Sequence, residues 1–145
     1  MTKHLKLSLK RFHAIEVTRI AIGNQKLVYA LIADRRFQYP HGKSAVAYIG
    51  TTKKGIRRVA SSVAYRAEDI LGEYGVKKIT ARIVTCKPRP RVKTWIKLER
   101  AMLLAFRAHY GKVPIYNFQG HKIKETDEYE YFAREAVRKL IIELG

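Results

Sequence analysis

Five side chains spread along the chain have the chemical types needed to cut a phosphodiester bond. These residues are Tyr29, Tyr48, Arg58, Glu99 and Asn117. A phenol with a lowered pKa can act as a general base on water, and a guanidinium can bind a phosphate and stabilise the charge of its transition state. Each residue taken alone more often has a packing or surface role, so the prediction depends on all five occurring in this order.

Glu99 is the sharpest of these signals because it lies on the most apolar helix that the sequence predicts. Trp95 and Met102 are its neighbours one turn away, and a carboxylate near a buried face costs free energy unless it has a partner. One interpretation is a structural ion pair with Arg100, with Lys97 or with a residue of another helix. The other is a Mg²⁺ ligand, since Mg²⁺ is often held by one or two carboxylates while water and substrate phosphate supply the remaining oxygens.

The chain is strongly basic, with a formal net charge of +18 over 145 residues. This excess favours a polyanionic partner and an affinity that falls as salt rises. A solvated surface is the alternative for any single basic cluster, but three clusters beside few acids favour nucleic acid. We expect the clusters to contact DNA, or RNA with the same phosphates, and their members are Arg35, Arg36 and Lys43; Lys53, Lys54 and Arg57; and Lys87, Arg89 and Arg91.

Several other classes of protein are disfavoured by the composition. Hydrophobic residues make up 47% of the chain, which indicates a globular domain, and no apolar run is long enough to span a membrane. The single cysteine, Cys86, allows no internal disulfide and predicts a reducing, cytoplasmic setting. There is no phosphate-binding glycine loop, and the histidines lack the spacing of zinc ligands, so nucleotide hydrolases and zinc enzymes are set aside.

The elements that must position these side chains follow from the hydrophobic periodicity. In chain order we expect one or two strands over 5–22, a strand over 27–33, a long hairpin loop over 34–44, a returning strand over 45–50, a helix over 56–72, a strand over 78–86, a helix over 93–110, and a last helix from about Asp127, with Glu130 completing a capping box. This order predicts an α+β fold, a small antiparallel β-sheet flanked by helices.

The chain is expected to form a single domain with three parts. Residues 1–26 would be an N-terminal strand extension, residues 27–119 the core, and residues 120–145 a C-terminal helix. The last helix carries an apolar stripe that could cover the sheet or dock a second subunit. A homodimer could therefore form through the N-terminal strands or through the C-terminal helix.

These motifs resemble those of the GIY-YIG nuclease superfamily. Leu27-Val28-Tyr29 would be the first motif and Tyr48-Ile49-Gly50 the second, and Arg58 lies at the usual offset of the family arginine, with Arg57 as a fallback. Glu99 in Leu98-Glu99 followed by Met102-Leu103 is similar to the metal-binding glutamate motif, and Pro114-Ile115-Tyr116-Asn117 resembles the closing asparagine motif. The chain departs from the pattern at Leu27, which replaces a glycine, and in the longer spacing between the two motifs, which predicts the enlarged hairpin loop.

The resemblance implies a stand-alone, metal-dependent DNA endonuclease of a restriction-like or repair-like kind. In such an enzyme Tyr29 or Tyr48 helps to deprotonate water, Glu99 holds Mg²⁺ or Mn²⁺, Arg58 steadies the phosphate, and Asn117 orders the site through hydrogen bonds. Two alternatives stay open: a non-catalytic nucleic-acid-binding protein on the same fold, and a basic protein of a ribonucleoprotein assembly.

Overall fold

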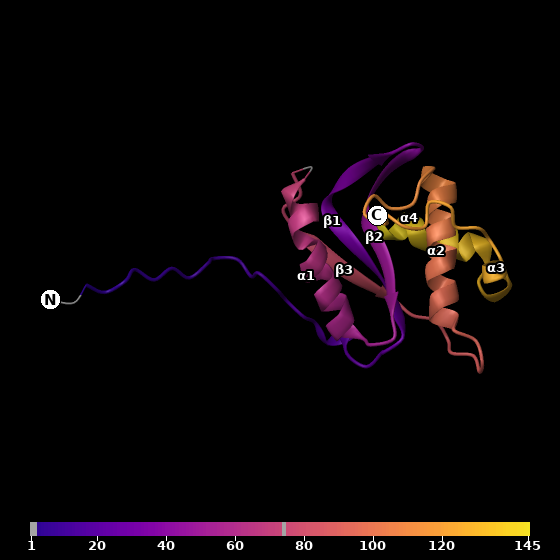
Figure 1. Cartoon of the computed structure of the whole chain (residues 1–145), viewed down its shortest axis with the longest axis horizontal. Coiled ribbons are helices and arrows are strands. Elements are labelled where there is room, and N and C mark those ends of the chain that lie inside the picture. Colours follow the sequence, from indigo (N-terminus) through magenta and orange to yellow (C-terminus); the bar gives the residue numbers. More distant parts are fainter. Residues whose placement is uncertain (1–2, 74) are drawn as a thin grey trace.

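The computed structural model describes residues 3–73 and 75–145 and has an α+β fold (Figure 1). A three-stranded antiparallel sheet has the order β2-β1-β3. The elements in chain order are the short 3₁₀-helix η1 (Arg19–Ala21), β1 (Leu27–Tyr39), β2 (Gly42–Thr52), α1 (Ile56–Gly72), β3 (Ile79–Val84), α2 (Thr94–Tyr110), α3 (Glu128–Tyr131) and α4 (Arg134–Leu144). The predicted fold class, a small antiparallel sheet flanked by helices with a helix at the C-terminal end, is confirmed.

Helices lie on both sides of the sheet, with α1 on one side and α2 on the other (Figure 1). The α1 helix turns Val59 and Ile70 into the core. The α2 helix is buried on most of its surface because α4 packs against it and against β2. Gly111 ends α2 in the left-handed conformation, with φ of 86° and its N–H donated to the Arg107 carbonyl at 2.8 Å. Glycine adopts this conformation at little cost, and the predicted helix end is confirmed.

The predicted hairpin loop over 34–44 is wrong, because both strands continue through it. β1 runs to Tyr39, β2 starts at Gly42, and only Pro40 and His41 form the turn. The Tyr39 ring packs edge-on against Phe106 of α2, with ring centroids 5.1 Å apart, and its hydroxyl donates to the Val46 carbonyl at 2.7 Å. Buried aromatic contacts therefore extend the hairpin, and the extra length between the two tyrosine motifs is absorbed by longer strands and an irregular register between Ile32 and Phe37.

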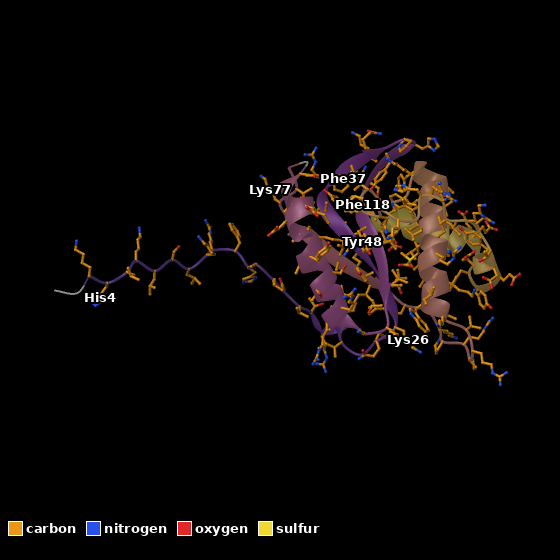
Figure 2. The ribbon with its side chains drawn as sticks, in the orientation of Figure 1. His4, Lys26, Phe37, Tyr48, Lys77 and Phe118 are labelled. Atoms are coloured by element: carbon orange, nitrogen blue, oxygen red, sulfur yellow. The ribbon has the colours of Figure 1, made fainter. Side chains whose placement is uncertain are left out.

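The predicted N-terminal strands are also absent from the described residues. Residues 3–18 form an extended arm that leaves the folded body, with His4 far out along it (Figures 1 and 2). The outer edge of β2 is already occupied: Tyr116 donates its N–H to the Ala47 carbonyl at 2.9 Å, and Asn117 binds both backbone groups of Ile49. Alternating residues in the arm have the pattern of a strand, but at Ala47 and Ile49 the edge of β2 is already paired with residues 116 and 117.

The predicted last helix is interrupted. The α3 helix ends after Tyr131, and extended backbone at Phe132 and Ala133 separates it from α4. The expected capping box does not form, since the Asp127 carboxylate accepts a hydrogen bond from Lys97 at 2.7 Å and makes no side-chain cap.

Candidate active site

The β1–β2 hairpin brings Tyr29 and Tyr48 together on one face of the sheet. Leu31 pairs directly with Tyr48, and Tyr29 pairs with Gly50. Because side chains two residues apart on a strand share a face, both phenols project to the same side, and their ring centroids lie 6.1 Å apart. Tyr29 is only 3% exposed, whereas Tyr48 is partly buried and keeps some access to solvent.

Two polar residues of α1 complete this phenol pair, and the predicted site did not include them. The Tyr29 hydroxyl donates to the Ser62 Oγ at 2.8 Å, and the Arg66 guanidinium donates to the same oxygen at 2.7 Å. The Arg66 Cζ also lies 3.7 Å from the centre of the Tyr48 ring, a cation–π contact. The sequence held a signal for these two residues, because Arg58, Ser62 and Arg66 are spaced four apart and therefore lie on one face of the helix.

Arg58 itself lies near the start of α1 and is exposed. It lines an open surface depression of about 650 Å³ together with Lys53, Lys54 and residues 21–25. No hydrogen bond or cation–π contact joins it to the tyrosines in the described part of the chain. The site residues predicted from sequence therefore separate: the two tyrosines meet each other, while Arg58 lies about one helical turn (~6 Å) before Ser62 and about two turns (~12 Å) before Arg66 along α1.

Glu99 projects from α2 and has no hydrogen bond or ion pair with any described residue. Burial raises the pKa of its carboxyl to about 7, and the cation of Arg100 opposes this only in part. The carboxylate also acts on the phenol site, because its charge raises the pKa of Tyr48. In the described residues every fully buried side-chain polar atom has a partner, so the unpaired oxygens of Glu99 are not sealed from solvent.

The cations that could have paired with Glu99 are taken by other acids. Arg100 donates through Nε to the Glu128 carboxylate at 2.6 Å, and Lys97 donates to Asp127 at 2.7 Å. Glu128 is fully buried and accepts further hydrogen bonds from the Thr126 backbone N–H and hydroxyl. The structural ion pair that the sequence offered as the alternative for Glu99 is thus made by its neighbours on α2 instead.

The electrostatics of Tyr48 are balanced between opposing effects. Burial raises the pKa of this phenol above its ordinary value, the neighbouring Tyr29 and the Glu99 carboxylate add to the rise, and the Arg66 cation lowers it. Before any substrate or metal binds, the phenol is therefore protonated at neutral pH. Additional positive charge near Tyr48 would be needed for it to accept a proton.

Asn117 holds the backbone of the second tyrosine motif. Its Oδ1 accepts the Ile49 N–H at 2.9 Å, and its Nδ2 donates to the Ile49 carbonyl at 2.8 Å. Both bonds are buried and involve the residue directly after Tyr48. Asn117 thus fixes β2 beside Tyr48 in the sequence, and among the described residues it makes no hydrogen bond to either phenol.

The predicted DNA-contacting residues are all exposed, but they lie at two ends of the molecule. All nine of them, Arg35, Arg36, Lys43, Lys53, Lys54, Arg57, Lys87, Arg89 and Arg91, are on the surface. The register places Leu27, Thr52 and Val84 at one end of the sheet, from which α1 and the loop before α2 start, and the hairpin turn lies at the far end.

The distance between these ends separates the clusters into two groups. Strand rise over β1 gives roughly 40 Å from Leu27 to Tyr39. Lys26, at the first end, places its ammonium 4.5 Å from the Trp95 ring centre (Figure 2). The Lys53–Arg57 and Lys87–Arg91 clusters therefore share the end nearer to the phenols and to the start of α2, while Arg35, Arg36 and Lys43 belong to the long arm of the hairpin.

The donors for a metal are few. In residues 3–73 and 75–145 no three His, Cys, Asp or Glu side chains group as a metal site. Among the described acids, the unpaired carboxylate of Glu99 is the one whose charge reaches Tyr48, which fits a hard cation that takes its remaining oxygens from water and a phosphate, and does not fit one held by protein alone.

Comparisons with known proteins identify no relative of this chain, so the function of the site is inferred from its geometry. Protein-family models, curated proteins and solved structures give no match to this chain. Among the described helices, none has the length and apolarity to cross a membrane. What the arrangement offers chemically is a phenol pair, an arginine stacked on one phenol, and an unpaired carboxylate whose charge reaches that phenol.

Proposed function

We propose that the protein is a divalent-metal-dependent DNA endonuclease of the GIY-YIG type. The observation that carries the proposal is Glu99: a partly buried carboxylate without an ion pair whose charge acts on Tyr48. A carboxylate perturbed by burial and left unpaired beside other titratable groups is typical of functional sites. The basic surface, with a net charge of +18, supplies the attraction to the phosphate backbone.

Glu99 is the proposed ligand for Mg²⁺ or Mn²⁺. When bound there, the cation would supply positive charge next to Tyr48 and would make a coordinated water more acidic. The carboxylate must be ionised to bind it, so proton and metal compete for the same oxygens. The burial that raises the pKa of Glu99 to about 7 therefore makes metal binding pH-dependent near neutrality.

Tyr48 is the better placed of the two phenols to accept a proton from water. The Tyr29 hydroxyl is buried and already donates to Ser62, so its hydrogen-bonding capacity is partly used inside the fold. Tyr48 keeps solvent access and feels both Arg66 and Glu99. In this proposal Tyr48 is the general base, and Tyr29 holds Ser62 and the α1 helix in position.

Arg58 and the clusters near it hold the nucleic acid over this site. Arg58, Lys53 and Lys54 line one open depression, and basic side chains there can contact several backbone phosphates without reading sequence. Asn117 keeps β2 rigid through its two bonds to Ile49. The free cysteine Cys86 suits a reducing compartment, and we propose a cytoplasmic location.

Two other functions have a specific observation in their favour. The lack of a multi-residue metal group in the described chain suits a non-catalytic DNA-binding protein on the same fold. The extended basic arm suits a member of a ribonucleoprotein assembly, since such arms order on binding RNA. The arm also exposes Leu5, Leu7 and Leu9, so a second copy of the chain stays a proposed partner there; the apolar stripe of α4 is already used against α2 and β2.

A cleavage assay tests the proposal. Supercoiled plasmid is incubated with the protein and Mg²⁺ or Mn²⁺, and again with Glu99→Gln, which keeps the size of the side chain and removes its charge. We expect nicking by the native chain, loss of nicking in the variant, and unchanged DNA binding in both. DNA that is bound and left intact under every metal condition would favour the binding protein, and a preference for structured RNA at matched salt would favour the assembly protein.

A further inference from the structure

Arg66 is a partly buried cation with no acidic partner among the described residues. Its hydrogen bond and ring contacts are with neutral groups: the Ser62 Oγ at 2.7 Å, the Tyr48 ring centre at 3.7 Å and the Tyr65 ring centre at 5.6 Å. A partly buried cation without a counter-ion loses part of its hydration with no opposite charge to compensate, and an anionic ligand would supply that charge. The surroundings of Arg66 thus indicate an anionic ligand that does not come from the chain itself.

The geometry of the guanidinium also suits a phosphate. Two contacts hold the group: its Cζ lies 3.7 Å from the centre of the Tyr48 ring, and one Nη1 hydrogen is used by Ser62. The remaining N–H donors have no partner in the described residues and lie in the plane of the group, at its edge. An arginine held by two contacts in this way is preorganised to bind two phosphate oxygens at once, which a lysine cannot do.

We propose that Arg66 binds the nucleic-acid phosphate that lies at the two phenols, which is the scissile phosphate if the proposed endonuclease function holds. The contacts of Arg66 support the binding of a phosphate, whereas the identification of that phosphate as the cleaved one rests on the proposed endonuclease function. Arg66 would then hold the phosphate beside Tyr48, the phenol on which the charge of Glu99 also acts.

Arg58 takes a different place on the same strand of nucleic acid. Eight residues of helix separate Arg58 from Arg66, which corresponds to about 12 Å along α1. One strand of a duplex advances 3.4 Å per nucleotide along its axis, so two long side chains with this separation can contact phosphates a few nucleotides apart. The pair would align a strand along α1, with Arg66 at the reacting position and Arg58 in the basic depression.

Three variants test the assignment. Arg66→Gln removes the charge, Arg66→Lys keeps a charge without the planar fork, and Arg138→Gln removes an equally basic residue from an exposed ion pair on α4 as the control. Single-turnover plasmid nicking gives the rate, and duplex binding in a Glu99→Gln background gives the affinity. We expect Arg66→Gln to slow nicking by about 10²–10³-fold, the loss typical of one group that stabilises transition-state charge, with Arg66→Lys restoring only a small part. The affinity for duplex DNA should change far less in Arg66→Gln, because many phosphate contacts contribute to it. Arg138→Gln should have the nicking rate and the affinity of the native chain.

A second measurement does not depend on cleavage. The Nε–H signal of Arg66, identified by its loss in Arg66→Lys, is followed by NMR while inorganic phosphate is added to the full-length protein. We expect a saturable shift of this signal, and no such shift for the Nε–H of Arg138. A native cleavage rate in Arg66→Gln overturns the inference and leaves the endonuclease standing. If the native chain cuts no DNA, the proposed function fails by itself, and the phosphate titration still decides whether Arg66 binds phosphate; an unmoved signal overturns it.

Discussion

Gly50 lies directly beneath the ring of Tyr29. A Cβ atom built on Gly50 would stand 2.7 Å from the Tyr29 hydroxyl and 2.7 Å from Cε1 of Tyr48, closer than real side chains approach. The second tyrosine motif therefore requires a glycine at this position, because the rings of Tyr29 and Tyr48 leave no room for a side chain on residue 50.

Gly50→Ala should consequently destabilise the protein and displace the phenols. We expect the free energy of unfolding to fall by about 1–3 kcal/mol, the usual cost of overfilling a packed site, and plasmid nicking to fall with it. Gly72→Ala is the matched control, because a Cβ there meets no atom within 4 Å. Chemical denaturation of both variants gives the comparison, and an unaffected Gly50→Ala would show that the phenols do not depend on this contact.

Loss of the Nδ2 donor of Asn117 alone should lower the stability of the protein. Asn117→Asp keeps the shape and the Oδ1 acceptor but faces the Ile49 carbonyl with an oxygen in place of the Nδ2 donor. We expect a loss of about 1–3 kcal/mol or more, because a buried carbonyl loses its partner and a charge is buried beside it. Gln119→Glu, an exposed neighbour in the same segment, should leave unfolding by urea unchanged; equal effects from the two substitutions would contradict the clamp.

The raised pKa of Glu99 gives stability a definite pH dependence. Between its ordinary value of 4.5 and about 7 the folded chain binds more protons at this site than the unfolded chain, so this contribution to stability is present below pH 4.5 and is lost as pH rises through 7. Glu99→Gln removes the effect and should be more stable than the native chain at pH 8 by about 1–3 kcal/mol, with the two converging near pH 4.

The same titration sets the expected pH dependence of cleavage. Metal binding requires the ionised carboxylate, so nicking should rise as pH increases through about 7. Thermal unfolding from pH 4 to pH 8 and initial nicking rates at saturating and limiting Mg²⁺ provide the two readouts. A flat stability difference between Glu99→Gln and the native chain would show that the carboxyl is not perturbed in solution.

Glu128 should act in the opposite direction, because its carboxylate is fully partnered. Burial would raise its pKa, but hydrogen bonds from Arg100 and Thr126 outweigh burial and hold the pKa at about 2. Stability from this group is therefore present above pH 4.5 and is lost as pH falls through 2. Glu128→Gln should cost about 1.5–3 kcal/mol at pH 7 and much less at pH 2, measured by urea unfolding at both values; a pH-independent cost would indicate packing alone.

The basic clusters at the phenol end should carry more of the DNA affinity than the hairpin cluster. Replacing Lys53, Lys54 and Arg57 by glutamine should weaken duplex binding and reduce the slope of log affinity against log salt by about one for each lost phosphate contact. The same change at Arg35, Arg36 and Lys43, far along β1, should alter the slope less. Fluorescence anisotropy over a range of salt concentrations measures both, and equal slopes would place the hairpin on the DNA as well.

The sequence by itself predicted the elements whose period is regular. The helix expected over 56–72 and the most apolar helix, expected over 93–110, each depend on residues within a few turns, so local spacing was enough to predict α1 and α2. The antiparallel hairpin that joins Tyr29 to Tyr48 was predicted for the same reason.

Only the tertiary structure decided which groups are partnered. Nothing in the spacing of Arg100 and Lys97 shows that Glu128 and Asp127 take them and leave Glu99 unpaired, because those contacts join residues about thirty positions apart. The packing of Tyr39 against Phe106 likewise turned an expected loop into strand, and Tyr116 and Asn117 occupied part of the outer edge of β2. Hydrophobic period is a local property, whereas hydrogen-bond satisfaction depends on which distant segments meet, and that difference explains why the elements were predictable and the completed site around Arg66 was not.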